Sequence, residues 1–92
     1  MDGTMNGNGT MRSSNGNFYQ GQFKNGKKSG KGKTIYYTGD VYEGILRNGF
    51  RHGRGIYKYR SGSVYEGECF EDMAEGKGKY VFHNGNVYEG QF

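Results

Sequence analysis

The sequence predicts an all-β protein, an elongated single-layer antiparallel sheet of four stacked β-hairpins. Three observations support this prediction: a 23-residue repeat, glycines confined to fixed positions of that repeat, and segments in which apolar and polar residues alternate. A tyrosine two residues before a glycine marks each repeat, at Tyr19, Tyr42, Tyr65 and Tyr88. Such self-similarity is typical of stacked small units rather than of a compact globule.

The composition agrees with a thin folded chain. The 92 residues include 19 glycines and no proline, whereas average glycine usage is about 7%. Only 32% of the residues are apolar, which is too few for a thick core, yet 16% are aromatic, which is too many for a disordered chain. The length excludes a two-domain enzyme. No apolar run approaches the 18 or so residues that would span a bilayer, and we expect an intracellular, cytoplasmic protein.

The repeat divides residues 1–92 into a single array of four units, residues 1–23, 24–46, 47–69 and 70–92. Glycine fills five positions of the unit, and Asp72 is the one departure from that pattern. The first unit has Met11 and Ser13 where the others have aromatic strand residues. Terminal units of an array meet water, so we interpret residues 1–23 as a degenerate N-terminal capping repeat.

Each of the other units reads as one β-hairpin. The first strands are predicted at 33–37, 56–60 and 79–83, and the second strands at 40–46, 63–69 and 86–92. A three-residue loop with Gly85 in a left-handed conformation would place Phe82 and Tyr88 on one face, whereas a two-residue loop would separate them. We therefore predict three-residue loops, with the tyrosines and the strand glycines sharing a face.

The same register predicts opposite charges across from each other on the other face. Each such pair is worth roughly 0.2–1 kcal/mol. The pairs are Lys33 with Glu43, Arg54 with Glu68, and Lys79 with Glu89.

No catalytic or metal site is predicted. Cys69 falls in an apolar column of the repeat, and His52 and His83 are the only imidazoles, so the chain has no cysteine and histidine cluster for zinc. Glutamates 23 residues apart, such as Glu43 and Glu66, read as a solvated row rather than a catalytic pair. We expect neither enzymatic activity nor a cofactor.

These residues resemble the MORN repeat (membrane occupation and recognition nexus). The matching pattern is Tyr-x-Gly, a further Gly, Gly-x-Gly and an aromatic strand, seen in residues 19–40, 42–63 and 65–86. The resemblance implies stacked hairpins with an aromatic-lined groove and no chemistry of their own. It also implies a scaffold in a ciliary, cytoskeletal or membrane-junction assembly.

The leading functional prediction is a non-catalytic scaffold whose aromatic groove binds a helix or an extended segment of a partner protein. Tyrosine suits an interface because it combines a large area and a polar tip with little rotamer entropy. A one-layer sheet must also bury some rings, so we expect about half of them to remain available. The predicted groove residues are Tyr36, Tyr42, Tyr57, Tyr59, Tyr65, Tyr80, Phe82 and Tyr88.

The alternative prediction is peripheral binding to anionic phospholipid membranes through basic inter-repeat loops. The net charge of +4 is a mild excess, and Glu71, Asp72 and Glu75 reverse the sign in the third loop, so a lipid patch would span two repeats. The candidate residues are Lys24, Lys27, Lys28, Lys31, Arg47, Arg51 and Arg54. Nucleic acid is not expected as a partner, because stacking among themselves explains the aromatic residues better.

Self-association is a further expectation. The predicted last strand ends at Phe92 without a polar cap like that of the first unit. An unprotected strand edge can pair with another strand or another copy of the chain.

Overall fold

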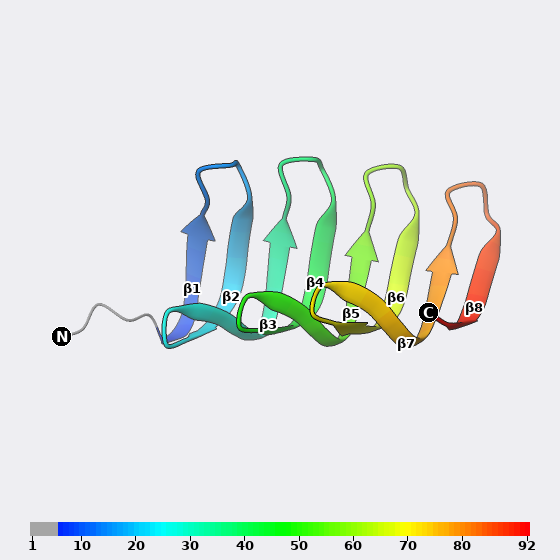
Figure 1. Cartoon of the computed structure of the whole chain (residues 1–92). Helices are drawn as coiled ribbons and strands as arrows, with labels where there is room; N and C mark the ends of the chain where they lie inside the picture. The colour runs from blue at the N-terminus through cyan, green and yellow to red at the C-terminus, as the bar shows by residue number, and fades with distance from the viewer. Residues whose placement is uncertain (1–5) are drawn as a thin grey trace.

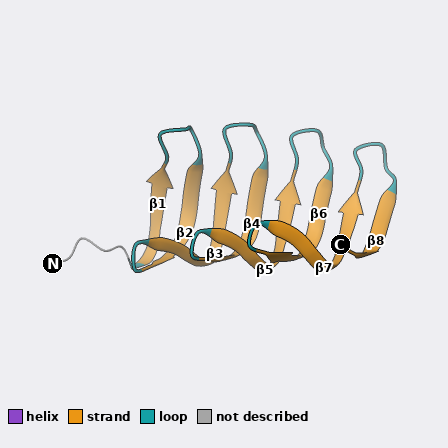
Figure 2. Ribbon diagram, in the orientation of Figure 1, coloured by secondary structure: helices purple, strands orange, loops and turns teal. Residues whose placement is uncertain are grey.

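The computed structural model describes residues 6–92 as one antiparallel sheet. Each of the eight strands pairs with its sequence neighbours, so the sheet is an uninterrupted meander (Figure 1) with extents of 51 × 25 × 16 Å. No helix occurs between residues 6 and 92 (Figure 2), and the predicted fold class is confirmed. The strands are β1 (Gly7–Arg12), β2 (Phe18–Lys24), β3 (Lys27–Ile35), β4 (Val41–Arg47), β5 (Phe50–Lys58), β6 (Val64–Phe70), β7 (Met73–Val81) and β8 (Val87–Gln91). Residues 1–5 of the predicted capping unit lie outside this description.

The hairpins within each unit close with three-residue loops, as predicted. Between β7 and β8, the Phe82 N–H donates to the Asn86 carbonyl (2.8 Å), and the loop holds residues 83–85. Gly85 has φ of 94°, the left-handed conformation that such a loop requires. The glycines of the equivalent loops, Gly16, Gly39 and Gly62, have φ of 99°, 99° and 100°.

The connections between units are shorter than predicted. Two residues join β2 to β3, β4 to β5 and β6 to β7, and both residues have positive φ in every case, as in a type I′ turn. The turn residues are Asn25–Gly26, Asn48–Gly49 and Glu71–Asp72. The prediction of inter-repeat loops was therefore wrong: β3 begins at Lys27, β5 at Phe50 and β7 at Met73. The residues that were predicted to form the inter-repeat loops therefore belong mostly to the first halves of these strands.

A line of glycines crosses the whole sheet, one from each strand, and marks a bend. Beyond this line the register shifts within the β2–β3, β4–β5 and β6–β7 pairs. The first halves of β3, β5 and β7 consequently turn away from the upper hairpins (Figure 1). The glycines of the line are Gly9, Gly21, Gly32, Gly44, Gly55, Gly67, Gly78 and Gly90.

The tyrosine of the Tyr-x-Gly motif in each unit packs onto this line. A Cβ at Gly44 would lie 2.8 Å from the Tyr42 hydroxyl, so the ring occupies the space that a side chain would need. The Tyr42 hydroxyl donates to the Ile45 carbonyl (2.8 Å) beside the register shift. Tyr19, Tyr65 and Tyr88 make the same bond to the carbonyls of Gln22, Glu68 and Gln91, at 2.8, 2.6 and 2.7 Å.

The core lies on the tyrosine face, inside the bend. Tyr42 is fully buried, whereas Tyr88 in the edge strand β8 is 46% exposed, because β8 has a neighbour on one side only. The core residues are Tyr19, Phe23, Tyr42, Leu46, Tyr65 and Cys69. Cys69 thus takes the packing role that its column predicts.

The residues whose backbone carbonyls close one loop also tie it to the next unit through their side chains. Asp40 Oδ1 accepts from the Arg60 N–H (2.8 Å) and Ser63 Oγ from the His83 N–H (3.1 Å). On the other face, the predicted opposite-charge residues do lie across from each other. None of them approaches within ion-pair distance, and the single ion pair among residues 6–92 joins Arg51 to Asp72.

The packing of tyrosine on glycine can be tested with Gly78→Ala. The new Cβ would lie 2.6 Å from the Tyr65 hydroxyl, and that ring is 3% exposed and has no room to move. We expect a loss of about 1–3 kcal/mol in the free energy of unfolding, measured by urea titration. The control is Gly9→Ala, on the same line, whose Cβ would make an ordinary 3.4 Å contact with Phe23. Equal losses in both variants would contradict this packing.

Candidate binding surface

Five aromatic rings form a continuous row on the tyrosine face, which we name the tyrosine ladder. Tyr57 and Tyr80 lie within β5 and β7, and the other three lie one residue beyond the ends of β3, β5 and β7. Each ring contacts the next along the row. Centroid distances are 5.7 Å for Tyr36–Tyr57, 4.5 Å for Tyr57–Tyr59, 5.6 Å for Tyr59–Tyr80 and 4.6 Å for Tyr80–Phe82.

The ladder is half-exposed, because the single-layer sheet has no second layer to cover it. Its four tyrosines are partly buried and pack against the core, and Phe82 is 43% exposed. The predicted groove set included two residues that do not reach this surface. Tyr42 and Tyr65 are core residues that support the ladder from below. Tyr88 is exposed and packs edge-on against Phe92 (5.1 Å).

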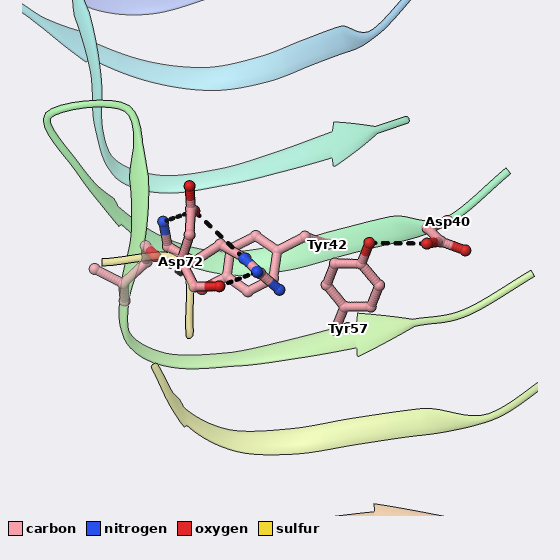
Figure 3. Close-up of polar contacts among 6 residues, drawn as sticks. Asp40, Tyr42, Tyr57 and Asp72 are labelled. Carbon is pink, nitrogen blue, oxygen red and sulfur yellow. Dashed lines mark hydrogen bonds and ion pairs between the residues drawn. The ribbon is translucent and has the colours of Figure 1, made fainter. Parts of the chain in front are cut away.

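Asp40 is a polar member of the surface that sequence analysis did not single out. The Tyr57 hydroxyl donates to Asp40 Oδ2 (2.8 Å, Figure 3). The other carboxylate oxygen, Oδ1, accepts from the Arg60 backbone, which holds the carboxylate in place. Asn17, Ser63 and Asn86 occupy the same position in the other units. This recurrence of short polar residues is the sequence pattern from which the role of Asp40 could have been predicted.

Arg51 also lies on the tyrosine face. Its guanidinium carbon is 4.8 Å from the Tyr57 centroid and 5.9 Å from that of Tyr42, within the range of cation–π attraction. Lys28, one repeat earlier, lies over Tyr19 (5.3 Å). Both residues were predicted to project from a basic loop edge, and that placement was wrong.

Asp72 holds Arg51 in position. Asp72 Oδ1 accepts from the Arg51 backbone N–H (2.7 Å) and from Nε (3.4 Å, Figure 3), and Arg51 Nη2 donates to the Asp72 carbonyl. Asp72 has φ of 71°, which is the conformation of the glycine that it replaces in the repeat. The single departure from the glycine pattern therefore supplies a side chain that anchors a cation beside the ladder.

Burial raises the pKa of three ladder tyrosines. Loss of solvent raises the pKa of Tyr36, Tyr57 and Tyr59 above the ordinary value, and Arg51 opposes the rise. The Asp40 carboxylate, which accepts the Tyr57 proton in a hydrogen bond, raises the pKa of Tyr57 further. Burial also raises the pKa of the Tyr42 hydroxyl and of the Cys69 thiol. The buried thiol is therefore poorly suited to act as a nucleophile.

These pKa shifts predict loss of stability in alkali. Above pH 10 the unfolded chain releases tyrosine protons that the folded chain retains, so the free energy of unfolding should fall as pH rises. Each such tyrosine contributes up to about 1.4 kcal/mol per pH unit. Urea titrations between pH 8 and 11 measure the slope, and Tyr57→Phe should make it shallower. A stability that does not change across this range would contradict the burial of the hydroxyls.

Several of the basic residues proposed for lipid binding gather in a hollow between the first two inter-repeat turns. This basic hollow has a volume of about 370 Å³ and is lined by three cations and no carboxylate. Its lining residues are Lys24, Asn25, Lys27, Ser29, Arg47 and Asn48. The equivalent hollow one repeat later is lined by Phe50, Phe70 and Glu71 among others, so it is not a cluster of cations without a carboxylate.

The face opposite the ladder has a larger hollow, of about 660 Å³, whose lining includes Ile45 and Ile56. Lys31, Arg54 and other long charged side chains form its walls. Such side chains are flexible, so the shape of this hollow is less fixed than that of the packed ladder. Residues 6–92 contain no cluster of three or more histidine, cysteine or acidic residues that could hold a metal ion. The described chain also has no helix that could span a membrane.

Comparison with known proteins identifies the repeat. The family model described as MORN repeat matches residues 1–18, 19–41, 42–64 and 65–87. The last three matches begin at Tyr19, Tyr42 and Tyr65, the residues whose rings pack on the glycine line. No curated protein matches the chain.

Proposed function

The chain belongs to the MORN-repeat family, and from this premise we propose that it is a non-catalytic scaffold that binds a segment of a partner protein on the tyrosine ladder. MORN repeats are generally binding modules without catalysis. The observation that carries the proposal is the ladder itself, a row of half-exposed rings in mutual contact on a sheet that holds them in place. The partner segment is a helix or an extended strand, in a ciliary or cytoskeletal assembly, a setting that rests on the family resemblance.

Tyr59 is the residue to change, because it contacts rings on both sides within the ladder. We expect Tyr59→Leu to weaken partner binding at least tenfold, as loss of a central aromatic contact commonly does. Capture from native extract, followed by titration of the purified partner, measures the effect. The control is Tyr37→Leu, which removes a tyrosine that is 71% exposed and lies outside the ladder. Equal affinity of the two variants would refute the proposal.

A second candidate function, peripheral binding to anionic phospholipid, is supported by the basic hollow. Three cations without a carboxylate attract phosphoryl groups, with each exposed cation worth about 1 kcal/mol near an anionic leaflet. Lys24→Glu with Lys27→Glu should abolish sedimentation with phosphatidylserine vesicles at low salt. The control is Lys58→Glu, which changes an exposed cation of β5 away from the hollow. Failure of the unaltered protein to sediment with these vesicles would refute this function.

Self-association is a third proposal, which sedimentation over a range of concentrations can test. β8 is an edge strand whose side chains Val87 and Tyr88 are 54% and 46% exposed. Such an edge can pair with a second copy.

A further inference from the structure

In two successive repeats a basic side chain lies over a tyrosine ring, Lys28 over Tyr19 and Arg51 over Tyr42 and Tyr57. The next repeat has no basic residue at the equivalent position. Lys28 and Arg51 occupy equivalent positions 23 residues apart, and the next position in the series is Ala74. The three residues occupy equivalent backbone positions on the tyrosine face, because each of them pairs with a core residue of the preceding strand. The pairs are Phe23 with Lys28, Leu46 with Arg51, and Cys69 with Ala74.

Tyr80 is the ring that this difference leaves uncovered. It is the counterpart of Tyr57, which carries the Arg51 guanidinium at 4.8 Å and bonds through its hydroxyl to Asp40. Tyr80 has the corresponding neighbours on either side, Tyr59 at 5.6 Å and Phe82 at 4.6 Å. Within residues 6–92, however, no cation lies over its ring and its hydroxyl makes no hydrogen bond.

The charge around this position also differs from that of the other repeats. Glu71, Asp72 and Glu75 place three carboxylates in the turn and strand that carry Ala74, whereas the first such turn is flanked by lysines. The nearest cation after them in the sequence is Lys77. Asp72 is already paired with Arg51, so within residues 6–92 the carboxylates of this turn and strand that have no ion pair are Glu71 and Glu75. These two carboxylates attract positive charge to this end of the ladder.

We infer that the position beside Ala74 and Tyr80 receives an arginine of the partner segment. The guanidinium lies on the Tyr80 ring as that of Arg51 lies on Tyr57, and the acidic third turn favours its approach. This inference rests on the proposed scaffold function and adds a specificity to it: the bound segment carries an arginine at the end of the ladder nearer β8.

The position can first be tested without a partner, by supplying the cation from the chain itself. Ala74→Arg should raise the melting temperature by about 2–8 °C relative to Ala74→Gln, which adds similar length without charge. The acidic turn alone would also favour a cation, so both substitutions are repeated with Tyr80→Leu. We expect the advantage of arginine to shrink in that background. An equal advantage with and without the Tyr80 ring would overturn the inference.

The second test uses two blocked peptides, Leu-Ala-Arg-Ala-Leu and the same peptide with neutral citrulline in place of arginine. Ring signals of Tyr59 and Tyr80 report binding by NMR. We expect the arginine peptide to bind about twofold to fivefold more tightly, and Tyr80→Leu, which changes no charge, to remove the preference. Equal binding of both peptides, or binding of neither, would overturn the inference.

The scaffold function is tested separately, by the Tyr59→Leu variant. If both peptides bind equally and Tyr59→Leu weakens both, the ladder binds segments without selecting arginine, and only the inference fails. If the captured partner binds Tyr59→Leu as well as it binds the unaltered chain, the scaffold function fails as well.

Discussion

The fold depends on one contact that recurs along the sheet, a tyrosine ring packed on a pair of glycines from adjacent strands; in the edge strand β8, Tyr88 packs on Gly90 alone. The ring occupies the space of the missing side chains, and its hydroxyl donates to the carbonyl three residues later, beside the register shift. That single contact explains several features together. It requires a glycine in each strand from β2 to β8. It also satisfies a backbone acceptor where the pairing of two strands is interrupted, and it fills the inside of the bend with apolar surface.

A sheet built in this way is thin, and its thinness creates the candidate binding surface. Within residues 6–92, six hydrophobic residues are buried. Each unit packs chiefly against its neighbours, so Tyr19, Tyr42 and Tyr65, which have a further unit after them, are buried, whereas Tyr88 in β8 is 46% exposed. The tyrosine ladder is stacked against the core on one side and open on the other, because no second layer covers it. Rings that the fold already holds in place lose little further freedom when a partner binds.

Residues that depart from the repeat pattern give the units different surface chemistry. Asp72 replaces a glycine at a cost in backbone strain, and it gains a carboxylate that anchors Arg51 beside Tyr57. Ala74 replaces a cation, which leaves Tyr80 uncovered at one end of the ladder. The basic hollow occurs at the first inter-repeat turns, and its counterpart one repeat later is aromatic and carries Glu71. Equivalent backbone positions thus present different chemistry from one end of the array to the other.

The sequence by itself determined the unit, the hairpin, the three-residue loop and the division of residues between two faces. These follow from local rules, namely alternation with a period of two and glycine where φ must be positive, as at Gly85. Only the tertiary structure decided where β3, β5 and β7 begin, because the register shift beside the glycine line, where Gly30, Gly53 and Gly76 have positive φ, interrupts the alternation that marks a strand. It also decided that Tyr42 and Tyr65 are core while Tyr57 and Tyr80 are surface. All four share one face, and their burial depends on which rings of neighbouring units pack over them, a contact that no single repeat contains.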